Sequence, residues 1–379
     1  MKKIHIAIIR QTYSSFGGAE KFIEALTNSL ANKIQVDVTI ICRKWKGDLP
    51  ENIRVVRISP FYTGRLTRDI GFMLGVKKHL KINQYDIVQS HERLAFCDIY
   101  RAGDGIHRSW LKRKNKKNFF QFWIDHLSPY HLYQLWQERR IFSGNSVKII
   151  VVNSSFIKQE AIQFYPSSEK KLITIRNGVN PNKFQCSNLD LSQRQHTRTE
   201  YGIQREDKLL LFVGSGYERK GLNFALRVLA KLPNEFRLMI VGKDKHESKY
   251  ISLSKTLGLK NRCVFLGPQV NPAKLYCACD AFIFPTQYDP MPNAVLEAMS
   301  SSCVCYVSDA SGASDYIENG MNGFVMGLDE PDKWAKVITH SFNESIETLG
   351  EEARKVMVEN HNEEMTSGFI ELYLQVARN

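Results

Sequence analysis

The chain has 379 residues, 43% of them hydrophobic and 24% charged, which is the composition of a soluble globular protein long enough for two domains. Its first apolar run, residues 4–9, is too short for a transmembrane segment and lacks the pattern of a signal peptide. Eight cysteines in such a chain predict free thiols in a reducing cytoplasm.

The positive charge is concentrated in the first half. The formal net charge is +13; residues 1–178 carry 30 Lys and Arg against 14 Asp and Glu, whereas residues 179–379 carry 22 against 25. We therefore expect the first half to face an anionic partner.

Apolar runs typical of strands alternate with helical patterns in the first half. The strands are predicted at 4–9, 36–41, 55–58, 86–89, 148–152 and 172–175, and the helices at 19–30, 69–80 and 156–164. This alternation predicts a parallel sheet with helices on both faces. Gly17 and Gly18, which follow the first strand, would let the backbone approach a ligand there; a simple tight turn is the alternative.

Two later stretches of the first half stand out. Asp104 lies in a polar loop at another strand end, where it would either line a site or cap the next helix. Residues 107–140 mix basic and aromatic side chains, which indicates nucleic acid or an anionic membrane surface, unless the rings pack on the sheet. The residues concerned are Arg108, Lys112, Arg113, Lys114, Lys116 and Lys117, then Phe119, Phe120, Phe122, Trp123, Tyr130, Tyr133 and Trp136.

The second half repeats the alternation after a boundary near residue 178. Residues 185–199 are polar without an apolar period and are expected to be an irregular surface insertion. Strands are predicted at 209–213, 237–241, 263–266, 281–284 and 303–307, and helices from Pro331 onward. After the first of these strands, Gly214 begins a glycine-containing turn that leads to Arg219 and Lys220. The turn would form a diphosphate clamp or, alternatively, a helix start with two solvated cations.

Residues 284–300 combine a buried strand end, three prolines and a helical pattern. The backbone N–H groups of Asn293, Ala294 and Val295 would form an anion site at the start of this helix. Asp289 and Glu297 flank it, as a sugar nucleotide with a phosphate and many hydroxyls would require. The alternative is an ordinary loop with one solvated acid and one acid at a helix terminus.

The cysteine pairs 277/279 and 303/305 suggest a zinc site. The second pair lies within a predicted strand, so we favour buried free thiols for both pairs.

Taken together, these features resemble glycosyltransferase family 4, whose members are retaining enzymes with the GT-B fold. The Gly17–Gly18 turn, the Arg219–Lys220 pair and the acid block from Asp289 to Glu297 occur in the family's order. Residues 98–104 and the stretch after them are similar to the lipopolysaccharide core glucosyltransferases that extend the inner-core heptose region. The family's block usually opens with Glu, and Asp289 in that place leaves the identity of the hexose open.

The resemblance implies an α/β fold of two Rossmann-like, doubly wound parallel-sheet domains that face across a cleft. Residues 1–178 would be the acceptor domain, with segment 107–140 toward a membrane. Residues 179–360 would bind the nucleotide sugar, and a helix at 361–379 would cross back to the first domain.

The resemblance also implies roles for individual residues. Asp104 would lie beside the acceptor hydroxyl, Asp289 would bind donor-sugar hydroxyls, Glu297 would bind the ribose, and Arg219 and Lys220 would hold the diphosphate. Gly17, Gly18, Gly214, Asn293 and Ala294 would complete the donor site, and the backbone near 267–270 would meet the base.

The implied reaction moves a hexose, best glucose from UDP-glucose, to a heptose or other sugar of the lipopolysaccharide core, with retention and without metal or cofactor. The implied partners are the nucleotide sugar, a lipid-linked saccharide and an anionic membrane surface, but no nucleic acid. The implied location is cytoplasmic, peripheral on the inner face of the cytoplasmic membrane. The alternatives are a catalytically silent sugar-nucleotide-binding module and a nucleic-acid binder that uses residues 108–123; the acidic second half argues against the latter.

Overall fold

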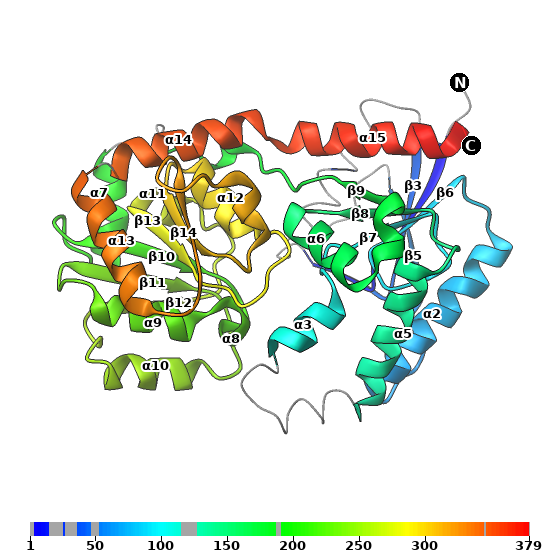
Figure 1. Ribbon diagram of the computed structural model, residues 1–379, viewed down its shortest axis with the longest axis horizontal. Coiled ribbons are helices and arrows are strands. Elements are labelled where there is room, and N and C mark those ends of the chain that lie inside the picture. Colours follow the sequence, from blue (N-terminus) through cyan, green and yellow to red (C-terminus); the bar gives the residue numbers. More distant parts are fainter. Residues whose placement is uncertain are drawn as a thin grey trace. The chain divides into compact units, whose positions relative to one another are not determined.

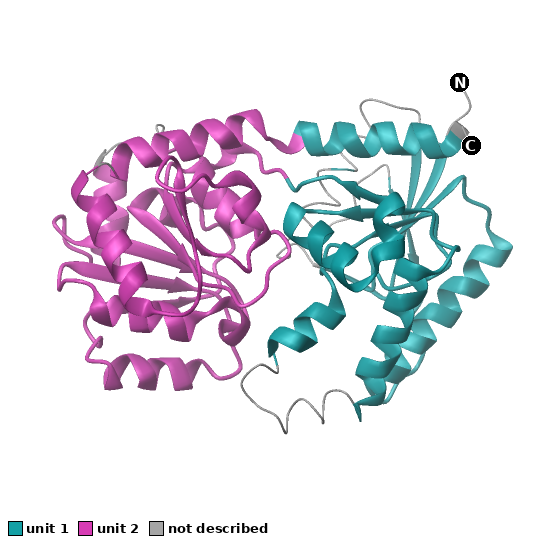
Figure 2. Cartoon of the chain, viewed as in Figure 1, with its two compact units in different colours: residues 1–177, 363–379 teal, residues 178–362 magenta. Residues whose placement is uncertain are grey.

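The computed structural model describes residues 4–14, 26, 36–46, 53–114, 127–186, 191–344 and 346–378. Gly17 and Gly18, most of the predicted helix over 19–30 and the basic and aromatic residues 116–123 lie outside these ranges. The chain divides into two compact units, Met1–Asn177 with Glu363–Asn379 and Gly178–Asn362 (Figure 2).

The first unit contains a sheet of seven described strands, all parallel (Figure 1). In their order across the sheet they are β5 (Ile53–Arg57), β3 (Val36–Cys42), β1 (Ile4–Ile9), β6 (Ile87–Ser90), β7 (Ile99–Arg101), β8 (Ile149–Val152) and β9 (Leu172–Thr174). The chain adds β3 and β5 on one side of β1, and β6 to β9 on the other. The order therefore reverses between β1 and β6, and ligands of open parallel sheets bind beyond the carboxyl ends of the strands at such a reversal.

Helices cover both faces of this sheet. Successive strand residues point to opposite sides, so alternate residues of one strand pack against different helices. Ile6 and Ile8 of β1 pack with Phe369 of helix α15 (Asn362–Arg378), whereas Ala7 and Ile9 pack with Phe72 of helix α2 (Arg65–Ile82). Further described helices of this unit are α3 (His107–Lys114), α5 (Pro129–Ser143), α6 (Ser155–Phe164) and the 3-10 helix η2 (Pro166–Lys171); β2 (Thr12–Ser14) and β4 (Lys44–Lys46) form a small parallel pair.

The second unit contains six described parallel strands. Their order is β12 (Cys263–Gly267), β11 (Phe236–Val241), β10 (Lys208–Val213), β13 (Ala281–Phe284), β14 (Val304–Ser308) and β15 (Gly323–Met326). Here the order reverses between β10 and β13. The strands lie between two hydrophobic clusters, each with its own helices.

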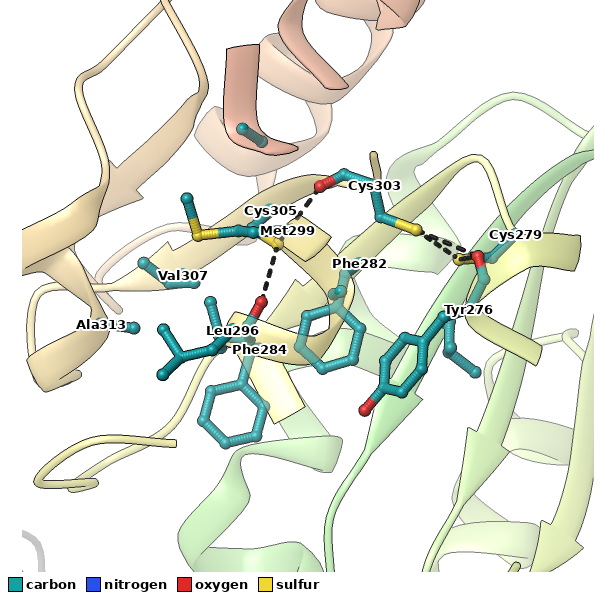
Figure 3. Packing of buried hydrophobic residues seen from close by; sticks show 14 of the residues in the cluster. Tyr276, Cys279, Phe282, Phe284, Leu296, Met299, Cys303, Cys305, Val307 and Ala313 are labelled. Carbon is teal, nitrogen blue, oxygen red and sulfur yellow. Dashed lines mark hydrogen bonds between the residues drawn. The ribbon is translucent and has the colours of Figure 1, made fainter. Parts of the chain in front are cut away.

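Phe282 and Phe284 of β13 belong to the first of these clusters, together with Leu296 of α12 (Asn293–Ser300) (Figure 3). Ile283 points to the other face, where α9 (Leu222–Lys231) and Trp334 of α13 (Pro331–Glu344) cover it. The remaining described helices are α7 (Leu191–Glu200), α8 (Tyr217–Lys220), α10 (Glu247–Thr256), α11 (Ala273–Ala278) and α14 (Ile346–Glu359), with the 3-10 helices η3 (Pro181–Phe184) and η5 (Gly312–Tyr316).

Residues 191–200 form helix α7, so the prediction of an irregular insertion over 185–199 is wrong for this part. The buried side of α7 is polar: Arg198 lies 3.3 Å from Asp280 and donates to the carbonyl oxygen of Ala278 at 3.1 Å. Arg194 also pairs with Asp280. A helix anchored by ion pairs shows no apolar period, which is why the pattern did not reveal it.

Cys186 and Cys277 form a disulfide, which corrects the prediction of free thiols for this pair. The two residues are 91 positions apart and meet only because the chain after η3 returns to α11. The other six cysteines are free. The thiols of Cys279 and Cys303 lie 3.2 Å apart in the core. Figure 3 shows how the two side chains point toward each other. Within the described ranges, no three His, Cys, Asp or Glu side chains gather as metal ligands.

None of the described helices combines the length and the apolar character that crossing a membrane requires.

Candidate active site

The loops after β10 and β13 meet at the carboxyl edge of the second sheet. Arg219 links them, because its Nη1 donates to the carbonyl oxygen of Tyr288 at 2.8 Å while its own carbonyl oxygen accepts from the N–H of Gln287 at 2.8 Å. The hydroxyl of Thr286 donates to the same carbonyl oxygen at 3.0 Å. The cations predicted from one loop and the acid predicted from the other are thereby brought together.

Gly221 makes this close approach possible. Its φ is +83°, a left-handed conformation that favours glycine, and a Cβ added there would lie 1.7 Å from the carbonyl oxygen of Pro285. Gly214 lies nearby: a Cβ added to it would meet the side chain of Lys220 at 3.1 Å. The glycines of this turn therefore set the position of Lys220 relative to the loop after β13.

Asp289 receives both cations. Its Oδ2 forms an ion pair with Nζ of Lys220 and lies 3.3 Å from Nη1 of Arg219. Asp289 is only 6% exposed, so the prediction's alternative, a solvated loop acid, is wrong. Burial lowers the pKa of Lys220, and the repulsion from Arg219 adds to this, while the charge of Asp289 raises it again.

The loop after β14 fixes the backbone of Asp289. The N–H of Asp289 donates to the carbonyl oxygen of Ala310 at 3.0 Å, and the N–H of Gly312 donates to the carbonyl oxygen of Asp289 at 2.8 Å. Three loops of the second sheet thus define the place of this carboxylate.

Helix α12 begins at Asn293, directly after Pro292. Asn293 and Ala294 are half-buried, as a helix start that receives an anion requires. The N–H of Val295, however, donates to the carbonyl oxygen of Pro292 at 3.0 Å, so the prediction that this group is available is wrong. The N–H of Val295, the third in the helix, is therefore used by a hydrogen bond within the first turn of α12.

Glu297, one turn further along α12, is 4% exposed and accepts a hydrogen bond from the hydroxyl of Tyr276 at 3.0 Å. Burial and the neighbouring carboxylate raise the pKa of Tyr276, which therefore stays a neutral donor. Tyr276 lies on α11, and sequence reasoning missed it because a single tyrosine in an apolar helix is ordinarily a core residue.

A second group of predicted residues lies in the first unit, where β1 and β6 end side by side. A pocket of about 260 Å³ opens there, lined by residues 10–12 after β1, residues 91–94 after β6, Asp104, and side chains of α2 and α5. Nη1 of Arg10 donates to Oδ2 of Asp104 at 3.2 Å. Of the lining residues, sequence reasoning singled out Asp104 and, in the basic and aromatic stretch, Tyr130 and Tyr133; the others carried no motif.

Asp104 is an ionised carboxylate. More than half of its side-chain surface is exposed. Desolvation by the surrounding protein acts to raise its pKa, but the positive charges of Arg10, Arg93 and Arg101 outweigh this and hold the pKa below 3.8. The alternative prediction was that Asp104 caps α3, and this is wrong. The first N–H groups of α3, on His107 and Arg108, donate to Glu138 of α5 instead.

His91, another residue of this pocket, is buried and neutral. Burial lowers its pKa well below 6.5, and the charges of Arg101 and Arg10 lower it further. Its Nε2 lies 2.8 Å from the side-chain amide of Gln89, whose oxygen accepts from the hydroxyl of Tyr373 on α15 at 2.8 Å. The C-terminal helix is therefore connected to the pocket wall through two hydrogen bonds.

In the described part of the basic and aromatic stretch, some side chains pack within the first unit and others are exposed. Arg113 turns inward and lies 3.0 Å from Glu160, and Tyr130 and Tyr133 are half-buried at the pocket. Lys112, Lys114 and Trp136 are exposed.

Two family models match the chain. Residues 16–183 match the model of Glycosyltransferase Family 4, and residues 193–363 match the model of Glycosyl transferases group 1.

Two relatives from Escherichia coli match over most of the chain. The lipopolysaccharide glucosyltransferase WaaG of strain K12 is 23% identical over 325 residues, which are 85% of this chain and 84% of that protein. The UDP-Gal:alpha-D-GlcNAc-diphosphoundecaprenol alpha-1,3-galactosyltransferase is 23% identical over 361 residues, 88% of this chain and 86% of that protein.

Solved structures share the architecture. The crystal structure of WaaG superimposes with a TM-score of 0.85 at 21% identity and covers 97% of this chain and 99% of its own. HepE of Anabaena in complex with UDP-glucose gives a TM-score of 0.77 at 18% identity and covers 98% and 100%. The predicted fold of two parallel-sheet α/β domains is confirmed.

Proposed function

This chain belongs to glycosyltransferase family 4 and has the GT-B fold, and on that basis we propose that it transfers a hexose from a nucleoside diphosphate sugar to a saccharide, with retention of the anomeric configuration. The observation that carries the proposal is the gathering of Arg219, Lys220 and Asp289 at the order reversal of the second sheet, where α12 also begins.

UDP-glucose is the proposed donor. The solved structure of HepE is in complex with UDP-glucose, and the name of the galactosyltransferase from Escherichia coli includes UDP-Gal. Asp289 would accept hydrogen bonds from hydroxyls of the donor sugar, and Glu297 from the ribose. Asn293 and Ala294, with Gly214 and Gly17–Gly18, would approach the diphosphate through their backbone. Residues 267–270 would approach the base.

The chemical problem of the reaction is the negative charge that develops on the departing diphosphate. The bond from the sugar C1 to the diphosphate oxygen breaks, and C1 bonds to the acceptor oxygen on the same face. The acceptor proton passes to an oxygen of the departing diphosphate. Lys220 and Arg219 are held in place by hydrogen bonds and ion pairs before the reaction, so they stabilise this charge without reorganisation.

We expect activity to survive chelation, because Arg219 and Lys220 supply the positive charge that a divalent ion would otherwise bring to the diphosphate. The measurement is nucleoside diphosphate release before and after treatment with EDTA. Loss of turnover that magnesium or manganese restores would contradict this.

The proposed acceptor is a lipid-linked saccharide of the lipopolysaccharide core, with a heptose as the sugar that receives the hexose. WaaG, a lipopolysaccharide glucosyltransferase, is among the relatives that match most of the chain. The proposed location is the inner face of the cytoplasmic membrane, to which the first unit would bind peripherally through segment 107–140.

We expect the full chain to sediment with vesicles rich in anionic lipid, less so at high salt. Exposed Lys112 and Lys114 on α3 and Arg139 and Arg140 on α5 would each contribute about 1 kcal/mol near such a surface before screening. Trp136, 51% exposed with the Arg140 guanidinium 4.7 Å from its ring centroid, would favour the headgroup level.

The matched experiment neutralises these four cations together and leaves Arg113 unchanged, since that residue holds Glu160. The control variant neutralises four exposed cations of the second unit, Lys231, Lys333, Lys336 and Lys355. Equal binding to neutral vesicles, or equal loss in both variants, would contradict membrane docking through this segment.

The function itself is tested with a panel of nucleoside diphosphate sugars, scored for binding and for slow hydrolysis by the full chain. Hydrolysis of one donor in preference to the others supports a transferase. Binding without turnover, even with saccharide acceptors present, would show a silent binding module.

A further inference from the structure

The pocket of the first unit lies where the order of the described strands reverses, which is where open parallel sheets bind ligands. β1 and β6 are neighbours, and the chain leaves them in opposite directions across the sheet. Residues 10–12 and 91–94 follow these two strands and line the pocket together with Asp104. α2 and α5 contribute the remaining wall.

Each arginine that lines this pocket already has a carboxylate partner. Arg10 lies 3.2 Å from Asp104 and 3.6 Å from Glu92. Arg68 lies 2.8 Å from Asp69, and Arg93 lies 3.5 Å from Glu138. The pocket is therefore rich in charged groups, but its positive and negative charges balance. This differs from the second unit, where Arg219 and Lys220 share the single carboxylate of Asp289.

Asp69 is the best-positioned of these carboxylates. It is 8% exposed on α2, and its two oxygens accept from the side-chain amides of Gln11 at 3.0 Å and Gln134 at 2.9 Å. The three residues come from the loop after β1, from α2 and from α5. These hydrogen bonds fix the carboxylate in one orientation. Oδ1 also accepts from Nε of Arg68 at 2.8 Å, so the lone pair left for a ligand hydroxyl is on Oδ2, beside the hydrogen bond from Gln134.

Glu92 is the second fixed carboxylate of the pocket. Its Oε1 accepts from the N–H of Gln11 at 2.9 Å. The pocket also contains apolar and aromatic surface, from buried Phe72 and from half-buried Tyr130 and Tyr133. Polar groups make up most of the lining, and these rings add a smaller apolar share.

We propose that this pocket binds an uncharged, polyhydroxylated ring of the acceptor saccharide and selects it against phosphorylated or carboxylated sugars. The proposal rests on the proposed function and adds the specificity of the acceptor side. Hydroxyl groups both donate and accept, so they fit alternating carboxylates and guanidinium groups without disturbing the ion pairs. A phosphate would have to displace a carboxylate from an arginine and would then lie beside Asp69, Glu92 or Asp104, where like charges repel.

The test measures binding directly, by saturation-transfer NMR of the full chain with uncharged hexose and heptose disaccharides and with their phosphate monoesters. We expect the uncharged sugars to bind at least tenfold more tightly than the esters. Asp69→Asn is expected to weaken the uncharged sugars about tenfold. The control is Asp37→Asn, at a half-buried aspartate of β3 outside the pocket, which should leave binding unchanged.

Glu92→Gln keeps the shape of the side chain and removes one negative charge. It should therefore reduce the difference in binding affinity between uncharged and phosphorylated sugars. A residue with a structural role only would weaken both alike. Thermal unfolding of each variant separates misfolding from lost contacts, and Glu92→Gln retains the test if Asp69→Asn does not fold.

Equal or tighter binding of the phosphate esters, or pocket variants that bind like Asp37→Asn, would overturn the inference. Donor hydrolysis, measured on the same variants, reports on the second unit. Donor turnover with no charge selection at the pocket refutes this inference alone, whereas no turnover of any donor refutes the proposed function.

Discussion

Lys220→Ala is expected to lower kcat by a factor on the order of 10² to 10³, with a smaller change in the KM for the donor. Lys220, whose side chain is 14% exposed, lies over the ring of Phe284 with its Nζ 4.9 Å from the ring centroid, and it pairs with Asp289. A preorganised cation in such a place gains strength as the diphosphate acquires charge, so its loss affects the transition state more than the bound donor. Steady-state kinetics with the donor identified from the panel is the measurement.

Glu297→Ala is the matched comparison, because Glu297 would contact the ribose, which does not change in the reaction. Its loss should raise the donor KM about tenfold and leave kcat nearly unchanged, since a hydrogen bond to a charged group is worth about 1.5–3 kcal/mol. The roles assigned to the two residues are wrong if both variants change only KM, or if their effects are exchanged.

The pH dependence supplies an independent check on Lys220. Because burial lowers its pKa from 10.5, deprotonation begins at a lower pH than for an exposed lysine, and kcat/KM should decline on the alkaline side below pH 10.5. Arginine remains protonated throughout this range. Lys220→Arg should therefore lack the alkaline decline, even if its overall rate is lower. An identical decline in both proteins would assign it to another group.

Gly221→Ala is expected to destabilise the second unit by about 4 kcal/mol and to abolish donor binding. Two costs combine at this position. An alanine would be strained at φ +83°, and its Cβ would overlap the carbonyl oxygen of Pro285, which is backbone and has no rotamer in which to escape. Relief requires the loops after β10 and β13 to separate, and this would move Lys220 away from Asp289.

Gly258→Ala is the control for the first cost. Gly258 also has a positive φ, +74°, but a Cβ added there meets nothing within 4 Å. This variant should lose only about 1 kcal/mol, from backbone strain. Chemical denaturation, with hydrogen exchange to report on the second unit, measures the loss of stability in the two variants. Similar losses for both would mean that the approach of the two loops does not depend on Gly221.

The local pattern of the chain was sufficient for the parallel sheets. Runs such as 4–9 and 281–284 are apolar throughout because strands covered on both faces have no polar side, and the order of strands and helices then requires crossover connections. The same patterns mark strand ends, so Arg219, Lys220 and Asp289 were recognisable before any contact was known. The strand ranges predicted from the sequence did not include β7 and β15. The loop with Asp104 was still placed at a strand end, which is the end of β7, whereas no signal marked β15.

Contacts between distant segments were decided only in the tertiary structure. Three contacts show this: the disulfide of Cys186 with Cys277, the ion pairs that anchor α7, and the hydrogen bond from Tyr276 to Glu297. In each case the sequence around one residue does not indicate its partner. The pocket of the first unit is the clearest case, because α2, α5 and two strand ends supply its walls. The sequence by itself determined which residues could carry the chemistry, since charge and backbone freedom are local properties. Their partners depend on packing, which brings together positions that no spacing along the chain relates.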